Sequence, residues 1–312
     1  MIVVTGASGY VGSHVVRRLV EVGKPVRALI RSRQRAEREG RLAGLTVEWV
    51  EGDVTRPETL PPAMAGATAV VHTVAIAIEK GGRTYEEVNY QGTVNVVEAA
   101  KAAGVRRFIN VSQLGASSRL PYRFLASKGK AQEYVAASGL DWTAFRPSVI
   151  WGPEDEFANT FARLIRLTPL IFPIVGDGQA KFQPVWVEDV VTCIVKALDD
   201  PSTIGQEYEL GGPEVLTLEE IERRTLRALG AWRLLVRFPL PLIRLAVALM
   251  EALLPAPPVT RSLLELLAVN NVTTQNAVQR FVADPRPFTP ENAAPYMRQF
   301  TARQALAQFL GR

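Results

Sequence analysis

The stretch Ile2-Val-Val-Thr-Gly-Ala-Ser-Gly-Tyr-Val-Gly12 decides the fold of this 312-residue chain. A short β-branched segment runs directly into three glycines, and an apolar helical pattern follows. Gly6 suits a sharp turn, Gly9 lets backbone amides approach an anion, and Gly12 lets the helix pack against the strand. The helix N-terminus then directs unpaired N–H groups at that anion. This order of strand, turn and helix predicts a pyrophosphate-binding turn.

Further predicted strands alternate with helical patterns along the chain. The apolar, β-rich segments are residues 2–5, 25–30, 46–50, 69–74, 107–111 and 142–146. Strands joined through helices pair in parallel, because each connection crosses back over the sheet. We therefore expect an α/β fold, a Rossmann-type doubly wound parallel sheet, over residues 1–150. A later strand and helix from about residues 181–200 should return to it, and residues 151–312 should form a substrate or lid region and a smaller, mostly helical C-terminal region.

Composition and charge limit the classes of ligand. The chain is 47% apolar and 21% charged, as is usual for a folded globular protein. Its net charge of +5 favours anionic ligands, but no nucleic-acid motif is recognisable, so no nucleic-acid partner is expected. Cys193 lies in an apolar helical run and should be a buried structural thiol. His14 and His72 lack the spacing of metal ligands, so no metal site is expected.

The residues after the second predicted strand bear on the choice between NAD(H) and NADP(H). A NAD-preferring site carries an acidic residue about 20 residues after the glycine turn, whereas this chain has Ile30-Arg-Ser-Arg33 there. Arg31 and Arg33 form a cationic fork that matches a 2′-phosphate, which favours NADP(H). A solvated helix start is the alternative, because mixed charges continue over residues 35–41.

Asp53 follows the third predicted strand, where its carboxylate could bind the adenine edge or cap a turn. Thr73, Val74 and Ala75 end the fourth strand and should line the cofactor at the carboxyl edge of the sheet.

Taken together, these motifs and several later ones resemble the extended and atypical short-chain dehydrogenase/reductases. The motifs are Thr5–Gly12, Gly52-Asp53, Val88-Asn89, Asn110-Val-Ser112, Lys128, Arg146–Pro153 and Gln183–Asp189. The resemblance covers roughly residues 1–225. Within the superfamily the chain is most similar to the nucleotide-binding accessory subunit of respiratory complex I and its bacterial relatives. The resemblance implies an NAD(P)-binding domain followed by a substrate region.

Active members of that family use a serine or threonine, a tyrosine and a lysine. Ser112 matches the substrate-orienting hydroxyl, and Lys128 matches the lysine that holds the nicotinamide ribose. Phe124 occupies the tyrosine position of the Tyr-x-x-x-Lys pair. On a helix, Tyr122 and Tyr134 should both point away from Lys128, so neither replaces the missing phenol. Ser112 could instead cap a turn, and Lys128 could be a surface lysine.

The motifs and the resemblance together give the expected cofactor contacts. They are Thr5, Gly6, Ser8, Gly9, Tyr10, Val11, Gly12, Arg31, Arg33, Asp53, Val54, Thr73, Val74, Ala75, Lys128, Pro147 and Val149.

Residues 223–255 form an unusual segment. Six arginines between positions 223 and 244 have no acidic residue among them, and an apolar helical pattern follows. The segment must be covered by protein or by a membrane surface, where arginines would meet anionic headgroups. No stretch reaches the roughly 18 to 20 apolar residues that span a bilayer, and strand pattern starts at Ile2 without a signal peptide. We expect a cytoplasmic protein, peripheral on the inner face of the membrane if this segment binds lipid.

The large apolar residues of the second half line a substrate cleft or pack in a core. They are Trp151, Phe157, Phe161, Phe172 and Trp186. If they form a cleft, its ligand is apolar or quinone-like. Because the phenol is absent, the leading hypothesis is an NADP(H)-binding structural or assembly module with weak or no dehydrogenase activity. An active NADPH-dependent reductase of an apolar carbonyl or quinone, and a nucleotide-ratio sensor, remain the alternatives.

Overall fold

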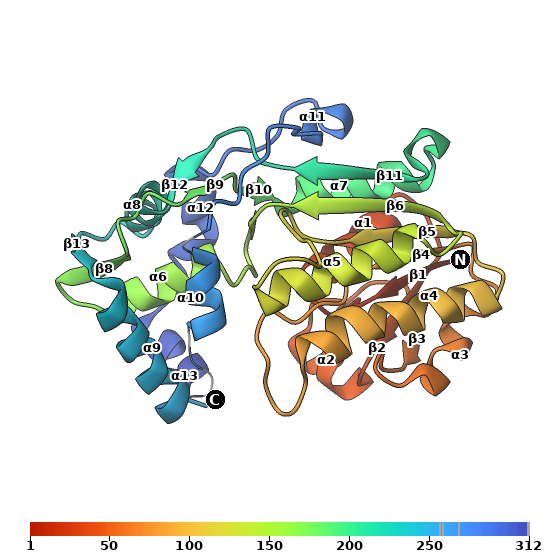
Figure 1. The fold of residues 1–312 in the computed structure, drawn as a ribbon, viewed down its shortest axis with the longest axis horizontal. Coiled ribbons are helices and arrows are strands. Elements are labelled where there is room, and N and C mark those ends of the chain that lie inside the picture. Colours follow the sequence, from red (N-terminus) through yellow and green to blue (C-terminus); the bar gives the residue numbers. More distant parts are fainter. Residues whose placement is uncertain (256, 258, 268, 311–312) are drawn as a thin grey trace. The chain divides into compact units, whose positions relative to one another are not determined.

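The computed structural model describes residues 1–255, 257, 259–267 and 269–310. They form two compact units (Figure 1). The first unit consists of Met1–Pro147, Val187–Leu210 and Gln275–Ala283. The second consists of Ser148–Trp186, Gly211–Thr274 and Asp284 onwards.

A seven-stranded parallel sheet is the centre of the first unit, in the order β11-β6-β5-β4-β1-β2-β3. Its strands are β1 (Ile2–Thr5), β2 (Val26–Ile30), β3 (Glu48–Glu51), β4 (Ala69–His72), β5 (Arg107–Val111), β6 (Asp141–Pro147) and β11 (Gln206–Leu210). All neighbouring strands pair in parallel. The strand order reverses beside β1, so the predicted Rossmann-type doubly wound sheet is confirmed.

Helices flank this sheet (Figure 1). They are α1 (Tyr10–Glu21), α2 (Arg33–Glu39), α3 (Pro61–Met64), α4 (Gly92–Ala102), α5 (Arg123–Ala136), α7 (Val187–Leu198) and α11 (Val278–Phe281), with 3₁₀ helices at Pro57–Thr59 and Pro201–Thr203 and a π-helix at Glu86–Gln91. On α1, Val15, Val16 and Leu19 are completely buried. Of the elements expected to return from residues 181–200, α7 belongs to this unit, whereas the strand that joins the sheet is β11. Cys193 on α7 is buried, as predicted.

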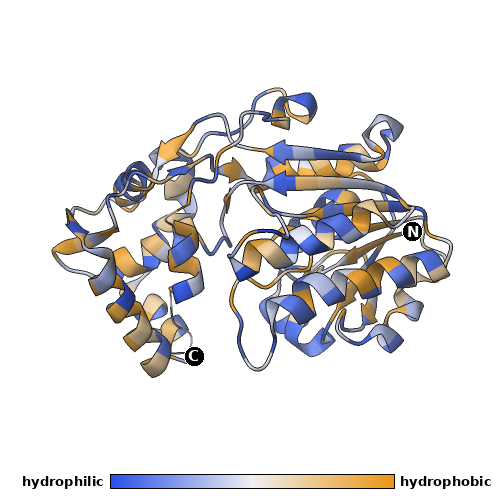
Figure 2. Ribbon diagram, viewed as in Figure 1, coloured by the Kyte–Doolittle hydropathy of each residue, from blue (hydrophilic) through white to orange (hydrophobic). Residues whose placement is uncertain are grey.

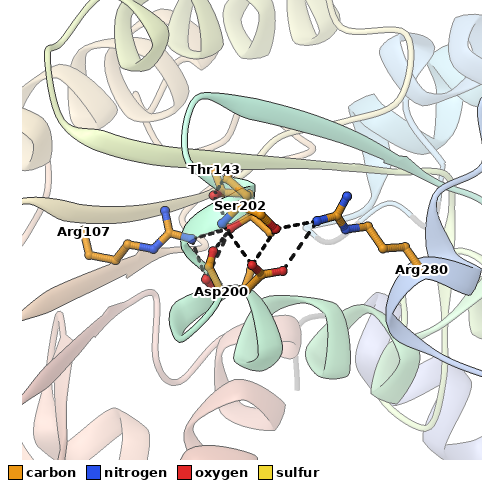
Figure 3. Close-up of polar contacts among 7 residues, drawn as sticks. Arg107, Thr143, Asp200, Ser202 and Arg280 are labelled. Carbon is orange, nitrogen blue, oxygen red and sulfur yellow. Dashed lines mark hydrogen bonds and ion pairs between the residues drawn. The ribbon is translucent and has the colours of Figure 1, made fainter.

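A polar network ties the end of α7 and the turn after it to the amino ends of β5 and β6 (Figure 3). Arg107 donates to the carbonyl of Asp141 at 2.7 Å and to Thr203 Oγ1 at 2.8 Å. Arg280, on α11, donates to Ser202 Oγ at 2.7 Å. Three segments that are distant in sequence are thus fixed to one edge of the sheet.

The second unit is built mainly of helices. Its helices are α6 (Ala158–Leu167), α8 (Leu218–Ala228), α9 (Leu240–Leu253), α10 (Arg261–Leu267), α12 (Pro290–Met297) and α13 (Ala302–Phe309). Its strands are β7 (Ile150–Trp151), β8 (Ile171–Val175), β9 (Lys181–Phe182), β10 (Val185–Trp186), β12 (Leu216–Thr217) and β13 (Leu234–Phe238), which form two-stranded pairs β10-β7, β12-β9 and β13-β8. Thr217 and Glu220 form a capping box at the start of α8.

The aromatic residues of this unit belong mainly to its core. Trp151, Phe161 and Phe172 are at most 5% exposed, and partly buried Phe157 and Trp186 pack against the same cluster. The rings of Trp151 and Trp186 lie 4.3 Å apart. Core packing, the alternative to a substrate cleft, is therefore the role of these residues that the structure supports.

Residues 223–255 include the end of α8 and the whole of β13 and α9. Leu242, Leu245, Leu249 and Leu253 follow one face of α9 and are between 54% and 77% exposed, and Figure 2 shows apolar residues along much of this helix. Within the described residues, no helix has the length and apolar character needed to cross a membrane.

Most of the arginines in this segment have partners that precede them in the sequence. Arg223 and Arg237 both pair with Glu219, and Arg224 pairs with Glu214. Arg233 donates to the carbonyls of Thr168 and Ile165. Four of the six arginines are therefore engaged, and the segment is less cationic than its sequence indicates.

Glu222 on α8 is fully buried, and neither carboxylate oxygen has a hydrogen-bond partner in the described structure. Burial, followed by the charge of Glu219, raises the pKa of Glu222 to about 8, so the side chain is protonated at neutral pH.

We predict that Glu222→Gln removes a pH dependence of stability. Because the folded pKa of about 8 exceeds the ordinary value of 4.5, the folded state holds a proton that the unfolded state releases. The free energy of unfolding should fall as pH rises between these values, by at most ~1.4 kcal/mol per pH unit from this group. Urea unfolding from pH 5 to 8 measures it, with exposed Glu265→Gln as the control. Parallel pH profiles for Glu222→Gln and the wild type would contradict the prediction.

Candidate functional site

The glycine turn joins β1 to α1 with a backbone that strongly favours glycine. Gly6 has a φ of +72°, and the amide of Gly9 donates to the carbonyl of Gly6 at 2.8 Å. A Cβ atom on Gly12 would lie 2.1 Å from that same carbonyl oxygen. Among the described residues, no side chain forms a capping hydrogen bond at the start of α1. The N-terminal amides of this helix therefore suit a diphosphate, as the sequence predicts.

The end of β4 packs against this turn, as expected for Thr73 and Val74. Thr73 Oγ1 donates to the carbonyl of Thr5 at 2.8 Å. A Cβ atom on Gly6 would meet Thr73 Oγ1 at 2.9 Å and Val74 Cγ2 at 3.1 Å. Ala75 follows in the same loop. The structure thus brings the predicted residues of β1 and β4 together at the carboxyl edge of the sheet.

His72 forms a polar connection beneath this edge. Its Nδ1 lies 2.7 Å from Thr5 Oγ1, and its Nε2 lies 3.0 Å from Thr93 Oγ1 on α4. Burial, followed by the charge of Lys128, lowers the pKa of His72 to about 3, so the imidazole is neutral. A lone histidine gives no sequence signal for such a role, which depends on a threonine 67 residues away.

Lys128 is buried, so its alternative interpretation as a surface lysine is wrong. It is 5% exposed, and its Nζ donates to the carbonyl of Val111 at 2.7 Å. Burial lowers the pKa of Lys128 to about 8. Lys130, two residues later, is the surface lysine of this helix and pairs with Glu86.

Ser112 follows β5 and is 4% exposed. Its amide donates to the carbonyl of Phe145 at 2.7 Å. Its Oγ is buried and has no partner in the described part of the chain, so the serine does not cap a turn through its side chain. A buried hydroxyl without a partner fits a site that a ligand completes.

The Phe124 ring and the hydroxyl of Tyr134 both contact groups other than Lys128. The Phe124 ring packs edge-on against Tyr85, with centroids 5.7 Å apart, and the Tyr85 hydroxyl donates to the carbonyl of Ala77. Tyr134 donates to Glu98 at 2.9 Å, pointing away from Lys128 as predicted. Tyr122 is the N-cap residue of α5.

The two arginines of the predicted fork have different surroundings. Arg33 pairs with Glu37 at 2.8 Å along α2, and its guanidinium lies over the ring of Trp49. Arg31 lies near other charges: burial, followed by the charges of Arg83 and Arg35, lowers the pKa of Arg31. Arg33 is thus engaged by neighbouring protein groups, whereas other cations lie near Arg31.

Asp53 caps a turn, which is one of the two roles expected from the sequence; the other is binding the adenine edge. Its Oδ1 accepts hydrogen bonds from the amide and hydroxyl of Thr55, both at 3.0 Å. The same carboxylate also receives Arg83 in a two-bond pair. Burial alone would raise the pKa of Asp53, but these hydrogen bonds hold it at about 2. Sequence reasoning missed Arg83, because no motif marks it.

The remaining residues predicted to contact the cofactor lie in different parts of the fold. The carbonyl of Ser8 accepts from Arg41, and Tyr10 lies edge-on to His14. Val11 is on the first turn of α1. Val54 is 5% exposed and packs in the core of the first unit. Pro147 ends β6, whereas Val149 belongs to the second unit.

Comparison with known proteins agrees with this geometry. Residues 6–201 match the sequence model of a family described as NAD(P)H-binding. The chain belongs to this family. It is 31% identical to the mitochondrial NADH dehydrogenase [ubiquinone] 1 alpha subcomplex subunit 9 of Arabidopsis thaliana, over 88% of this chain and 70% of that protein. It is 30% identical to the ceramide reductase of Caulobacter vibrioides, over 81% of this chain and 78% of that protein.

A solved structure shows the same fold. It is a short-chain dehydrogenase/reductase superfamily protein from Agrobacterium tumefaciens with bound NAD, 21% identical, with a TM-score of 0.70 over 100% of both chains. The protein is thus a member of the NAD(P)H-binding family whose Rossmann fold is like that of the extended short-chain dehydrogenase/reductases.

We predict that Lys128→Met weakens dinucleotide binding without lowering the stability of the free protein. The substitution removes a buried cation whose desolvation opposes folding, but it also removes the donor expected at the nicotinamide ribose. NADPH affinity should fall about tenfold or more, the scale of one charge-assisted hydrogen bond. Thermal unfolding without ligand and fluorescence titration with NADPH measure the two effects. Lys130→Met is the matched control, and a purely structural lysine would give the opposite result, a lower melting temperature with unchanged affinity.

Proposed function

We propose that this protein binds NADP(H) and acts as a nucleotide-dependent structural or assembly module, with weak or no dehydrogenase turnover. One observation carries the proposal: Phe124 stands where the proton-donating tyrosine is expected, while buried Lys128 and Ser112 are retained. Binding and turnover depend on different residues, so a chain can keep the first and lose the second.

Each part of the site has a distinct task in this proposal. The first-turn amides of α1 hold the diphosphate, and Arg31 attracts the 2′-phosphate. Lys128 holds the nicotinamide ribose, and Ser112 orients a polar group of any substrate. The bound cofactor supplies hydride chemistry. No phenol passes a proton to the product, and the loss of such an acid typically costs about 10² to 10⁴ in rate.

Its relatives support the two leading roles differently. The likeness to a subunit of NADH dehydrogenase favours a module that assembles with a respiratory membrane complex. The likeness to a ceramide reductase favours the competing function, an NADPH-dependent reductase of an apolar carbonyl compound. A nucleotide-ratio sensor would use the same binding residues. Measuring turnover separates the module from the reductase.

We predict that the wild-type protein binds NADPH but oxidises it slowly, and that Phe124→Tyr raises the rate. The new hydroxyl would stand four residues before Lys128, where a proton donor contributes up to about 10⁴ in rate. NADPH oxidation is followed by absorbance with a panel of long-chain ketones and quinones. Tyr134→Phe, on the same helix, is the control and should change nothing. Fast turnover by the wild type that Phe124→Tyr leaves unchanged would favour the reductase.

We further propose that the exposed leucines of α9 contact a membrane surface or a membrane-complex partner. These leucines form one exposed apolar face of α9. Four of the six arginines in residues 223–244 are already bound by protein groups. Binding to lipid would therefore depend on apolar insertion more than on anionic headgroups.

We predict that the protein sediments with phospholipid vesicles and stays bound at high salt. Leu245→Glu and Leu249→Glu should abolish the binding, because each places a charge on the inserted face. Leu306→Glu on α13, where the leucine is 50% exposed, is the control. Release of the wild type by 0.5 M salt would show instead that headgroup charge dominates, and no sedimentation at low salt would favour a protein partner.

A further inference from the structure

The Asp53–Arg83 pair lies next to the end of β2, which leads into Arg31, because the amide of Gly52 donates to the carbonyl of Ile30 at 2.8 Å. Arg83 has no role in the site as described so far. Arg83 Nη1 donates to Asp53 Oδ2 at 3.0 Å, and Nη2 donates to Oδ1 at 3.1 Å. The two residues are 30 positions apart and come from the loops after β4 and β3. This fork fixes the plane and position of the Arg83 guanidinium.

The fork leaves part of the Arg83 guanidinium available. Five N–H groups project from an arginine, and end-on pairing with a carboxylate uses two of them. The Nε atom of Arg83 is buried and has no partner in the described structure. An unsatisfied buried donor is costly unless a ligand completes it.

Several charged side chains also surround Arg31 and Arg83. The charge of Arg83 is the largest electrostatic influence on Arg31, ahead of those of Arg35 and Asp53, and it lowers the pKa of Arg31. The positive charge of Arg35 is balanced by its ion pair with Glu39. Asp53 balances one of the two remaining positive charges, those of Arg31 and Arg83. One net positive charge is left between Arg31 and Arg83, and this surplus would attract a phosphate group.

We propose that Arg83 is a second phosphate-binding arginine, which joins Arg31 on the 2′-phosphate of the dinucleotide, and that Asp53 is its positioning residue. The proposal rests on the proposed binding of NADP(H) and assigns its specificity to a pair of arginines from different loops. Asp53 then acts on specificity indirectly, by orienting the Arg83 guanidinium.

A purely structural role for Arg83 would be to hold its loop, but that loop has other anchors. The carboxamide of Asn89 pairs with both backbone groups of Ile76. The Tyr85 amide donates to Glu79, and the Tyr85 hydroxyl donates to the carbonyl of Ala77. The loop should therefore keep its conformation without Arg83.

The test compares the affinities of full-length variants for NADPH and NADH, with 2′,5′-ADP and 5′-AMP as fragments that differ by the 2′-phosphate. Arg83→Met should weaken NADPH and 2′,5′-ADP about ten- to a hundred-fold and leave NADH and 5′-AMP nearly unchanged. Asp53→Asn should reduce the NADPH-to-NADH preference by a smaller factor. Arg123→Met is the matched control, because Arg123 pairs with Glu79 near the same loop but outside the arginine pair.

The outcomes separate this inference from the proposed function. A wild-type protein without preference for NADPH overturns both. A wild-type preference that is lost in Arg31→Met but kept in Arg83→Met overturns the inference alone. Equal weakening of NADPH and NADH by Arg83→Met, with a lower melting temperature, shows a structural role and also overturns it.

Discussion

The close approach of α1 to the first turn is the constraint on which the rest of the structure depends. The carbonyl of Gly6 occupies the space that a side chain at position 12 would need, at 2.1 Å from an ideal Cβ atom. Because Gly12 has no side chain, the helix can start directly above the end of β1. The amides of its first turn then face the carboxyl edge of the sheet, where Thr73 and Val74 pack against the glycine turn.

The polar groups around this edge divide into two kinds. His72 is satisfied on both ring nitrogens and is neutral, so it belongs to the scaffold. Lys128 and Ser112 are buried with unused capacity, a single carbonyl for the ammonium and no partner for the hydroxyl. Folding alone does not account for groups of the second kind, because an apolar residue of similar size would cost less to bury. This unused hydrogen-bonding capacity is the reason for assigning both residues to ligand binding in the proposed function.

Local sequence patterns predicted the sheet and the glycine turn well, because both depend on neighbouring residues. The segment 107–111 became β5 and the segment 2–5 became β1 with the predicted bounds. Contacts between distant residues could not be read in this way. Arg83 reaches Asp53 only through the fold, and the glutamates that neutralise the arginines of residues 223–244 lie upstream of that segment. The burial of Lys128 likewise could not be predicted without the packing of α5, because a Lys-Gly-Lys sequence is typical of an exposed helix surface.

The contribution of α11 to the first unit has a consequence for synthesis on the ribosome. Val278 and Phe281 are buried there, Lys196 donates to the carbonyl of Phe281, and Arg280 joins the network at the amino edge of the sheet. Translation must therefore pass residue 283 before the nucleotide-binding unit can acquire its last helix. Until then the nascent chain exposes the surfaces of α7 and β11 that this helix covers in the finished unit.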